Sequence, residues 1–193
     1  RSACRAQGCP VDSSPDTLRP VRIWSPLAGC APAPVLALAA YTPAAASLIV
    51  RWKENGERSA HLAMRDLLLR TIVAARRRFE VGTVVAVPTT WRSSASRGAD
   101  PLQAAVAAAG FPPARLLRRA SSRDQVGLSQ SARWFNASAG YELRSRVIAY
   151  ERLRLSPAVI VVDDLVTTGA TLVRCGQLLA AAGWDVRALV APF

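Results

Sequence analysis

The sequence predicts an α/β domain with a doubly wound, mostly parallel sheet that is flanked by helices. Short β-branched or apolar segments alternate with segments of helical periodicity, which is the pattern of βαβ units. One of these strands, residues 158–162, is apolar throughout, as expected of a central parallel strand that is buried on both faces. A chain of 193 residues is also long enough to bury a hydrophobic core without additional stabilisation by disulfide bonds or metal ions.

The first half of the predicted domain contains two strands and two helices. We expect a strand at 35–41 and a short helix from Pro43 to Lys53, because Asn55-Gly56 then gives a stop signal. Leucine, isoleucine and valine follow at near-helical spacing, which predicts an amphipathic helix over 57–78. A β-branched strand at 83–87 comes next and ends at Pro88.

The second half repeats the alternation. Pro101 suits the first turn of a helix at 101–109, and residues 110–113 break that helix. After the strand at 158–162, a helix is expected at 170–182, closed by Gly183, and a last strand at 186–191. Short connections between these elements favour two βαβ units in one sheet.

Residues 1–34 differ from the rest, because they are rich in Pro, Ser, Gly and Cys and have no apolar periodicity. We interpret them as an irregular N-terminal arm that precedes a domain at 35–193. Cys4, Cys9 and Cys30 lie in this arm, whereas a structural zinc site uses four ligands in two close pairs. The arm is therefore either irregular chain or a degenerate zinc module that is one ligand short.

The net charge of +12 is almost entirely arginine, since Lys53 is the single lysine. A basic surface attracts polyanions such as nucleic acid or phosphorylated metabolites, although an Ala- and Arg-rich composition also gives this charge without a partner. No run of the sequence approaches the roughly 18 apolar residues of a membrane-spanning helix. We expect a cytoplasmic protein without membrane insertion.

The segment at 159–172 contains the residues that indicate a ligand-binding site. A buried strand leads to Asp163 and Asp164 at its carboxyl end, where open α/β sheets bind ligands. Gly169 and a following helix then offer backbone N–H groups for a phosphate. The hydroxyls of this turn belong to Thr167, Thr168 and Thr171. Carboxylates beside a phosphate cradle indicate a phosphorylated sugar; the alternative is that the acids only cap the helix and the threonines are ordinary turn residues.

This segment resembles the phosphoribosyl diphosphate signature of type I phosphoribosyltransferases. Other stretches resemble one group of such proteins, the ComF family, which is linked to competence, the uptake of single-stranded DNA. The stretches that keep the order of that family are Trp52-Lys53 with Gly56, Val87-Pro88, Arg97-Gly98, and Gln125 with Leu128-Ser129, Arg133 and Asn136. The resemblance covers about residues 41–193 and implies a type I phosphoribosyltransferase-like fold.

The resemblance also implies a role for each site residue. Asp163 and Asp164 would bind the ribose hydroxyls and, with Arg97, form the catalytic set. The residues implied for the 5′-phosphate are Val166, Thr167, Thr168, Gly169, Ala170 and Thr171. Those implied for the pyrophosphate are Pro88, Thr89 and Thr90, with Lys53 and Arg92 as cations. Mg²⁺ would accompany the ligand as cofactor. For Lys53, a helix C-terminal cation favoured by the dipole is the alternative.

Two functions remain open from the sequence. One is transfer of a 5-phosphoribosyl group from phosphoribosyl diphosphate to an acceptor that the sequence does not identify. The other is a non-catalytic phosphoribosyl diphosphate-binding module in the competence machinery, with single-stranded DNA as a candidate partner. The second is favoured by residues 97–101, where the family's Arg-Gly-Phe-Asn-Gln reads Arg-Gly-Ala-Asp-Pro. The arginines best placed for DNA are Arg76, Arg77, Arg78, Arg115, Arg118 and Arg119, and Trp52, Trp91 and Trp134 could stack on bases.

Overall fold

The structure, a computed structural model, describes residues 17–21, 31–89, 100–120, 140–144, 151 and 154–193. In these ranges the chain forms a five-stranded sheet in the order β1-β2-β7-β6-β3 and a separate β4-β5 pair. The strands are β1 (Arg19–Pro20), β2 (Val35–Ala37), β3 (Thr83–Ala86), β4 (Leu117–Arg119), β5 (Tyr141–Leu143), β6 (Ala158–Val162) and β7 (Asp185–Ala191). The helices are α1 (Pro43–Lys53), α2 (Arg58–Phe79), α3 (Pro101–Ala108) and α6 (Ala170–Ala181).

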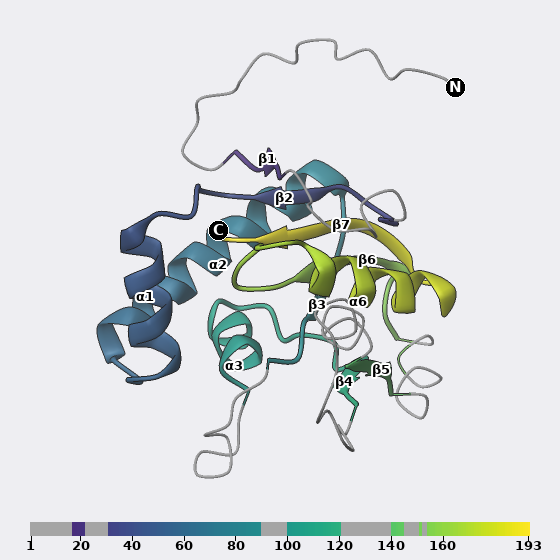
Figure 1. Cartoon of the computed structure of the whole chain (residues 1–193). Coiled ribbons are helices and arrows are strands. Elements are labelled where there is room, and N and C mark those ends of the chain that lie inside the picture. Colours follow the sequence, from purple (N-terminus) through teal and green to yellow (C-terminus); the bar gives the residue numbers. More distant parts are fainter. Residues whose placement is uncertain (1–16, 22–30, 90–99, 121–139, 145–150, 152–153) are drawn as a thin grey trace, which may run out of the picture.

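The sheet is mostly parallel and has helices on both faces. β2, β7, β6 and β3 run parallel, and only β1 pairs antiparallel, at the edge next to β2. In Figure 1, α2 passes behind the sheet and α6 lies in front of it. α3 packs against α2 and therefore belongs to the rear layer. The predicted α/β architecture is confirmed at this level.

Local sequence explains the main elements. Along α2 the buried side chains recur every three or four residues, which makes one apolar stripe. They are Ala60, Met64, Leu68, Thr71, Ile72 and Ala75. In β6, Val159 to Val162 are all fully buried, because α2 and α6 cover the two faces of the sheet. The core therefore lies on both sides of β6 and β7.

The predicted helices and long strands agree with the structure to within one or two residues. The expected strand at 35–41 is shorter, since β2 ends at Ala37. Two corrections concern short strands. Arg19–Pro20 lies in the arm that we expected to be irregular, yet it pairs with β2, and Leu18 beside it is buried. β4 and β5 were not predicted, and they pair antiparallel with each other.

The connections that leave β3 and β6 diverge. From β6 the chain turns into α6 on the front face, whereas from β3 it leads to α3 in the rear layer. These two strands are neighbours, with Val87 N donating to Val162 O at 2.8 Å just beyond β3. Open α/β sheets bind ligands at the carboxyl ends of neighbouring strands whose connections diverge in this way, and we refer to this position as the crevice.

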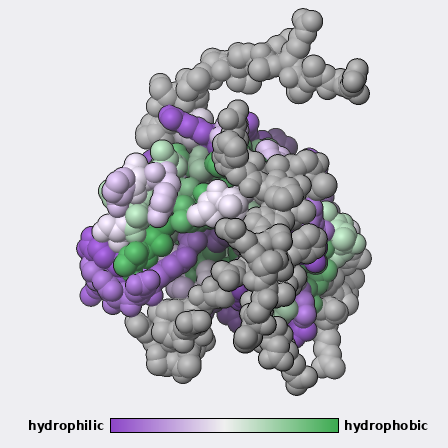
Figure 2. All heavy atoms as spheres, in the orientation of Figure 1, coloured by the Kyte–Doolittle hydropathy of each residue, from purple (hydrophilic) through white to green (hydrophobic). Residues whose placement is uncertain are grey.

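The surface beside α1 carries hydrophobic side chains. Tyr41 is 54% and Val50 46% exposed, and Figure 2 shows hydrophobic residues at the surface on the α1 side of the molecule. Scattered apolar residues of this kind are ordinary for a folded domain. Among the described residues, no helix combines the length and the apolar character needed to cross a membrane.

Candidate functional site at the carboxyl edge of the sheet

Asp163 and Asp164 directly follow β6, and backbone hydrogen bonds fix them at the carboxyl edge. Asp163 N donates to Val190 O of β7 at 2.9 Å, and Asp164 N donates to Asp163 Oδ1 at 2.9 Å. Both residues are almost completely buried, with 8% and 5% of their surfaces exposed. Two adjacent carboxylates are therefore held in a largely desolvated position.

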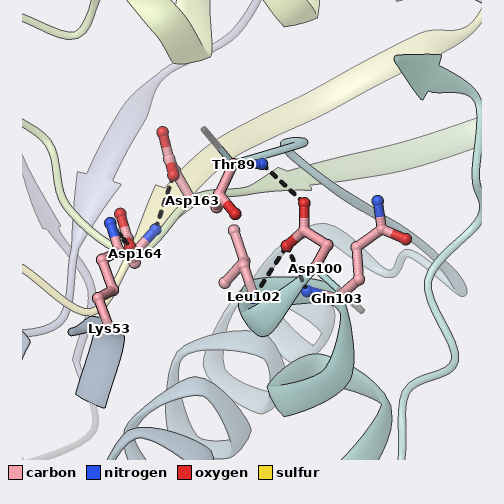
Figure 3. Close-up of polar contacts among 7 residues, drawn as sticks. All are labelled: Lys53, Thr89, Asp100, Leu102, Gln103, Asp163 and Asp164. Atoms are coloured by element: carbon pink, nitrogen blue, oxygen red, sulfur yellow. Dashed lines mark hydrogen bonds and ion pairs between the residues drawn. The ribbon is translucent and has the colours of Figure 1, made fainter. Parts of the chain in front are cut away.

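Lys53, in the last turn of α1, forms an ion pair with Asp164 Oδ2. Figure 3 shows Lys53 and Asp164 facing each other at the crevice. The lysine is partly exposed while the aspartate is buried, so the ammonium neutralises a charge that would otherwise stand in a low-dielectric environment. Sequence reasoning offered a ligand role and a helix-end role for Lys53, and its position at the end of α1 is compatible with both.

Asp163 forms no ion pair of its own with another residue that the structure describes. Burial raises the pKa of Asp163 well above its ordinary value, and the neighbouring Asp164 carboxylate raises it further. The Asp164 N–H and the charge of Lys53 act in the opposite direction but more weakly. Because groups with strongly shifted pKa values concentrate at functional sites, Asp163 is the stronger candidate of the two for contact with a ligand.

The turn after the two aspartates leads into α6 through Gly169, which has φ 77°. This left-handed conformation suits glycine. The Thr168 hydroxyl accepts from Ala170 N at 3.3 Å, and the first intrahelical bond runs from Val173 N to Gly169 O. The N–H groups of Thr171 and the next residue precede that bond and belong to the first turn of α6, where backbone N–H groups can bind an anion. Val166 is fixed by its N–H to Phe193 O at 2.7 Å, and Thr167 is exposed.

The end of β3 forms the other wall of the crevice. Pro88 is buried, and Thr89 N donates to Asp100 Oδ2 at 2.7 Å. The other oxygen of Asp100 accepts from Leu102 N and Gln103 N, so this carboxylate caps α3 and ties it to β3. Figure 3 shows Thr89 next to Asp163 with Asp100 approaching from α3. The sequence predicted Pro101 in the first turn of this helix, but it did not predict the bond between Asp100 and Thr89.

A tyrosine that sequence reasoning missed supports the site from the front. Tyr141 of β5 is buried, and the Thr171 side chain interacts with its phenol. Burial raises the pKa of Tyr141 to about 12, so the phenol is neutral at physiological pH. Arg119 stacks on its ring at 5.1 Å and approaches its oxygen at 3.4 Å. Thr171, which the resemblance implies for phosphate, is thus already engaged with Tyr141.

Two polar atoms in this crevice are incompletely satisfied. Thr89 Oγ1 is buried and has no hydrogen-bond partner within the described part of the chain. Asp164 Oδ2 likewise has no hydrogen bond there and only its ion pair with Lys53. Buried polar groups without partners are rare in native proteins, and a bound ligand is one of the ways in which they are satisfied.

Several predicted residues lie outside the described ranges. These are Thr90, Arg92 and Arg97, the three arm cysteines Cys4, Cys9 and Cys30, and Trp91 and Trp134. Of the other candidates, Trp52 is fully buried, so it packs in the core and cannot stack on a base. Arg76 and Arg78 donate to Val81 O and Leu18 O, so two of the arginines suggested for DNA hold the end of α2 in place.

Within the described ranges, no three His, Cys, Asp or Glu side chains form a group that could hold a metal by themselves. Mg²⁺, however, is commonly bound by one or two carboxylates together with substrate phosphates. The pair of carboxylates at 163–164 fits a metal that arrives with a phosphorylated ligand. Comparisons with protein-family models and with curated proteins give no match to this chain.

Proposed function

We propose that this protein binds phosphoribosyl diphosphate with Mg²⁺ at the carboxyl edge of its sheet and transfers the 5-phosphoribosyl group to an acceptor. The observation that carries the proposal is the succession of two buried carboxylates, a threonine-rich turn and a helix that begins at Gly169. Carboxylate oxygens accept from the ribose hydroxyls, while the helix N-terminus binds the 5′-phosphate. The type I phosphoribosyltransferase-like fold belongs to the same proposal.

The crevice between β3 and β6 supports this assignment by its polarity. Acidic groups stand at one wall, and the helix dipole of α6 favours negative charge beside them. Thr89 at the opposite wall has a hydroxyl without a partner among the described residues, which suits a pyrophosphate oxygen. Lys53 adds a positive charge within reach of the same region. The carboxylates would face the hydroxyls at the centre of phosphoribosyl diphosphate, and the α6 N-terminus and Thr89 would face the phosphates at its two ends.

Asp163 and Asp164 would hold Mg²⁺ together with the ligand, and the metal would stabilise the negative charge of departing pyrophosphate. The contribution of the chain itself is positioning. The backbone bonds of Asp163 and Asp164 fix their carboxylates, and burial keeps water from competing for the ribose hydroxyls. Lys53 provides a fixed charge toward the developing anion.

The first experiment is a calorimetric titration with phosphoribosyl diphosphate and Mg²⁺. Replacing both carboxylates, Asp163→Asn with Asp164→Asn, should weaken binding by about 2–4 kcal/mol, or roughly 30- to 700-fold, because charge-assisted hydrogen bonds to the ribose are lost. The matched control is Asp66→Asn with Asp185→Asn, which removes the same charge from exposed positions. Equal affinities of the two double variants would refute the ribose assignment.

A second candidate function is binding without catalysis, as a phosphoribosyl diphosphate-binding module in the competence machinery, with single-stranded DNA as a candidate partner. Asp100 favours it, because both oxygens of this carboxylate accept backbone N–H groups of α3 and Thr89 and thus serve the fold. Release of pyrophosphate across a panel of nucleobase acceptors separates the two functions. The transferase requires release that depends on one acceptor, whereas the module binds the ligand and releases none.

A further inference from the structure

A second cleft lies on the other side of β3 from the aspartates. Ala114 N donates to Val84 O at 2.8 Å, so the chain after α3 runs along the edge of β3 that does not pair with β6. Between this chain, α3 and the β4–β5 pair is a cavity of about 580 Å³. Its lining includes Pro88 and Asp100, and it lies along the edge of β3 opposite to the one that pairs with β6.

The lining of this cleft combines a cationic rim with an apolar wall. Four arginines line it, namely Arg115, Arg118, Arg119 and Arg144. The one acid in the lining is Asp100, whose carboxylate is already taken by backbone N–H groups. Ala104, Ala107 and Leu117 contribute apolar surface together with three prolines, and Gln103 also lines the cavity. The rim is therefore strongly positive beside a surface that suits an uncharged ring.

The arginines divide into two fixed and two available groups. Arg118 is paired with Glu142 at 2.7 Å, and Arg119 stacks on Tyr141. The guanidinium groups of Arg115 and Arg144 form no ion pair and no hydrogen bond with any other residue that the structure describes. Two guanidinium groups that line one cavity and have no partner among the described residues suit a phosphate, which guanidinium binds through two parallel hydrogen bonds.

We propose that this cleft binds a phosphorylated small molecule of about nucleotide size. The volume lies in the range of small-ligand sites. The phosphate contacts Arg115 and Arg144, and the remainder of the ligand packs against the exposed alanines of α3. The cleft shares Pro88 and Asp100 with the wall of the first crevice, but Arg115 and Arg144 lie outside that crevice, so the proposal does not require that the proposed transferase function be correct.

The test is a titration with adenosine 5′-monophosphate in the absence of Mg²⁺. The double variant Arg115→Gln with Arg144→Gln should weaken binding at least about tenfold, because two charge-assisted contacts are lost. The control, Arg19→Gln with Arg58→Gln, removes two exposed arginines elsewhere and should stay within about twofold. Thermal unfolding of each variant verifies that the fold is retained.

A second variant acts from the opposite wall. Ala104 is exposed on α3, so Ala104→Glu places a negative charge in the cleft, whereas Ala104→Gln places a side chain of nearly the same size without charge. The Glu variant should weaken binding at least about tenfold more than the Gln variant. Equal losses would show that bulk alone matters and would overturn the phosphate assignment.

Three further outcomes would overturn the proposal. The first is no binding of the monophosphate at roughly millimolar concentration. The second is loss of binding in the Asp163→Asn, Asp164→Asn protein but not in the arginine variant, which would place the ligand in the first crevice. The third is that a short oligothymidylate binds through Arg115 and Arg144 while the monophosphate does not. Titration of the arginine variant with phosphoribosyl diphosphate and Mg²⁺ reports separately on the proposed function.

Discussion

Replacing Asp163 by Asn should make the unliganded protein more stable at neutral pH. Asn has nearly the same shape and its Oδ1 can still accept from Asp164 N, so the hydrogen bond seen at 2.9 Å is retained. What disappears is a carboxylate whose pKa burial and Asp164 raise well above its ordinary value. The substitution therefore removes an ionisation that the folded state disfavours.

The sign follows from proton binding. Above the unfolded pKa of about 3.9, the unfolded chain has lost the proton that folded Asp163 still holds. The free energy of unfolding of the wild type then falls as pH rises, by up to about 1.4 kcal/mol per pH unit, until the folded pKa is reached. Below pH ~4 the carboxyl is neutral in both states, so wild type and variant should be equally stable there.

Urea unfolding followed by tryptophan fluorescence at a series of pH values measures this difference. The gap between Asp163→Asn and the wild type should open from about pH 4 upward and then level off. Asp66→Asn is the control, because it makes the same substitution at a side chain that is 60% exposed beside Arg65, where an ion pair contributes at most about 1 kcal/mol to stability. A gap for Asp163→Asn that is constant over this range, or a variant that is less stable at neutral pH, would refute the reasoning.

Three other predictions concern packing, capping and metal. Gly176→Ala should cost about 1–3 kcal/mol in urea unfolding, because the added Cβ would meet two side-chain atoms at 2.9 Å. Gly82→Ala, with nothing within 4 Å, should change little, and equal effects would contradict the close approach of α6 to β7. Asp100→Ala should lower the free energy of unfolding by about 1–2 kcal/mol, because the N-cap of α3 is lost. Asp100→Asn should lower it less, since Asn still caps α3 although it has only one acceptor oxygen. Equal losses for the two variants would contradict this. Elemental analysis should find less than one zinc per chain, and one tightly held zinc that is lost on changing Cys4 or Cys9 to Ser would disprove it.

The sequence predicted those elements whose pattern is local. α1, α2, α3, α6 and β6 have helical periodicity, capping residues or a continuous apolar run, and each was expected within one or two residues of its observed bounds. β1, β4 and β5 have two or three residues each, too few to show a period. They depend on pairing with distant chain, as Arg19 does with Ala37, and no local signal specifies that pairing.

The residues of the candidate site also fall into those that are contiguous in the sequence and those that only the fold brings together. The acids and the glycine turn at 163–169 are contiguous, so their order could be read directly. Tyr141 is different, because its role depends on contacts with Thr171 and Arg119 from other elements. The pairing of Lys53 with Asp164 is equally non-local, and only the folded chain shows it. Sequence reasoning therefore found the groups on one strand and turn, but not their partners.

The bond from Thr89 N to Asp100 Oδ2 has a consequence for how this protein could be altered. It joins the two residues that flank the segment at 90–99, so the positions where that segment begins and ends are fixed relative to each other. The entropy of closing a loop grows only slowly with its length, by about 0.6 kcal/mol per doubling. Segments of other lengths and compositions could therefore be exchanged between these two residues while β3 and α3 keep their places, and the chemistry at this wall could change independently of the fold that supports it.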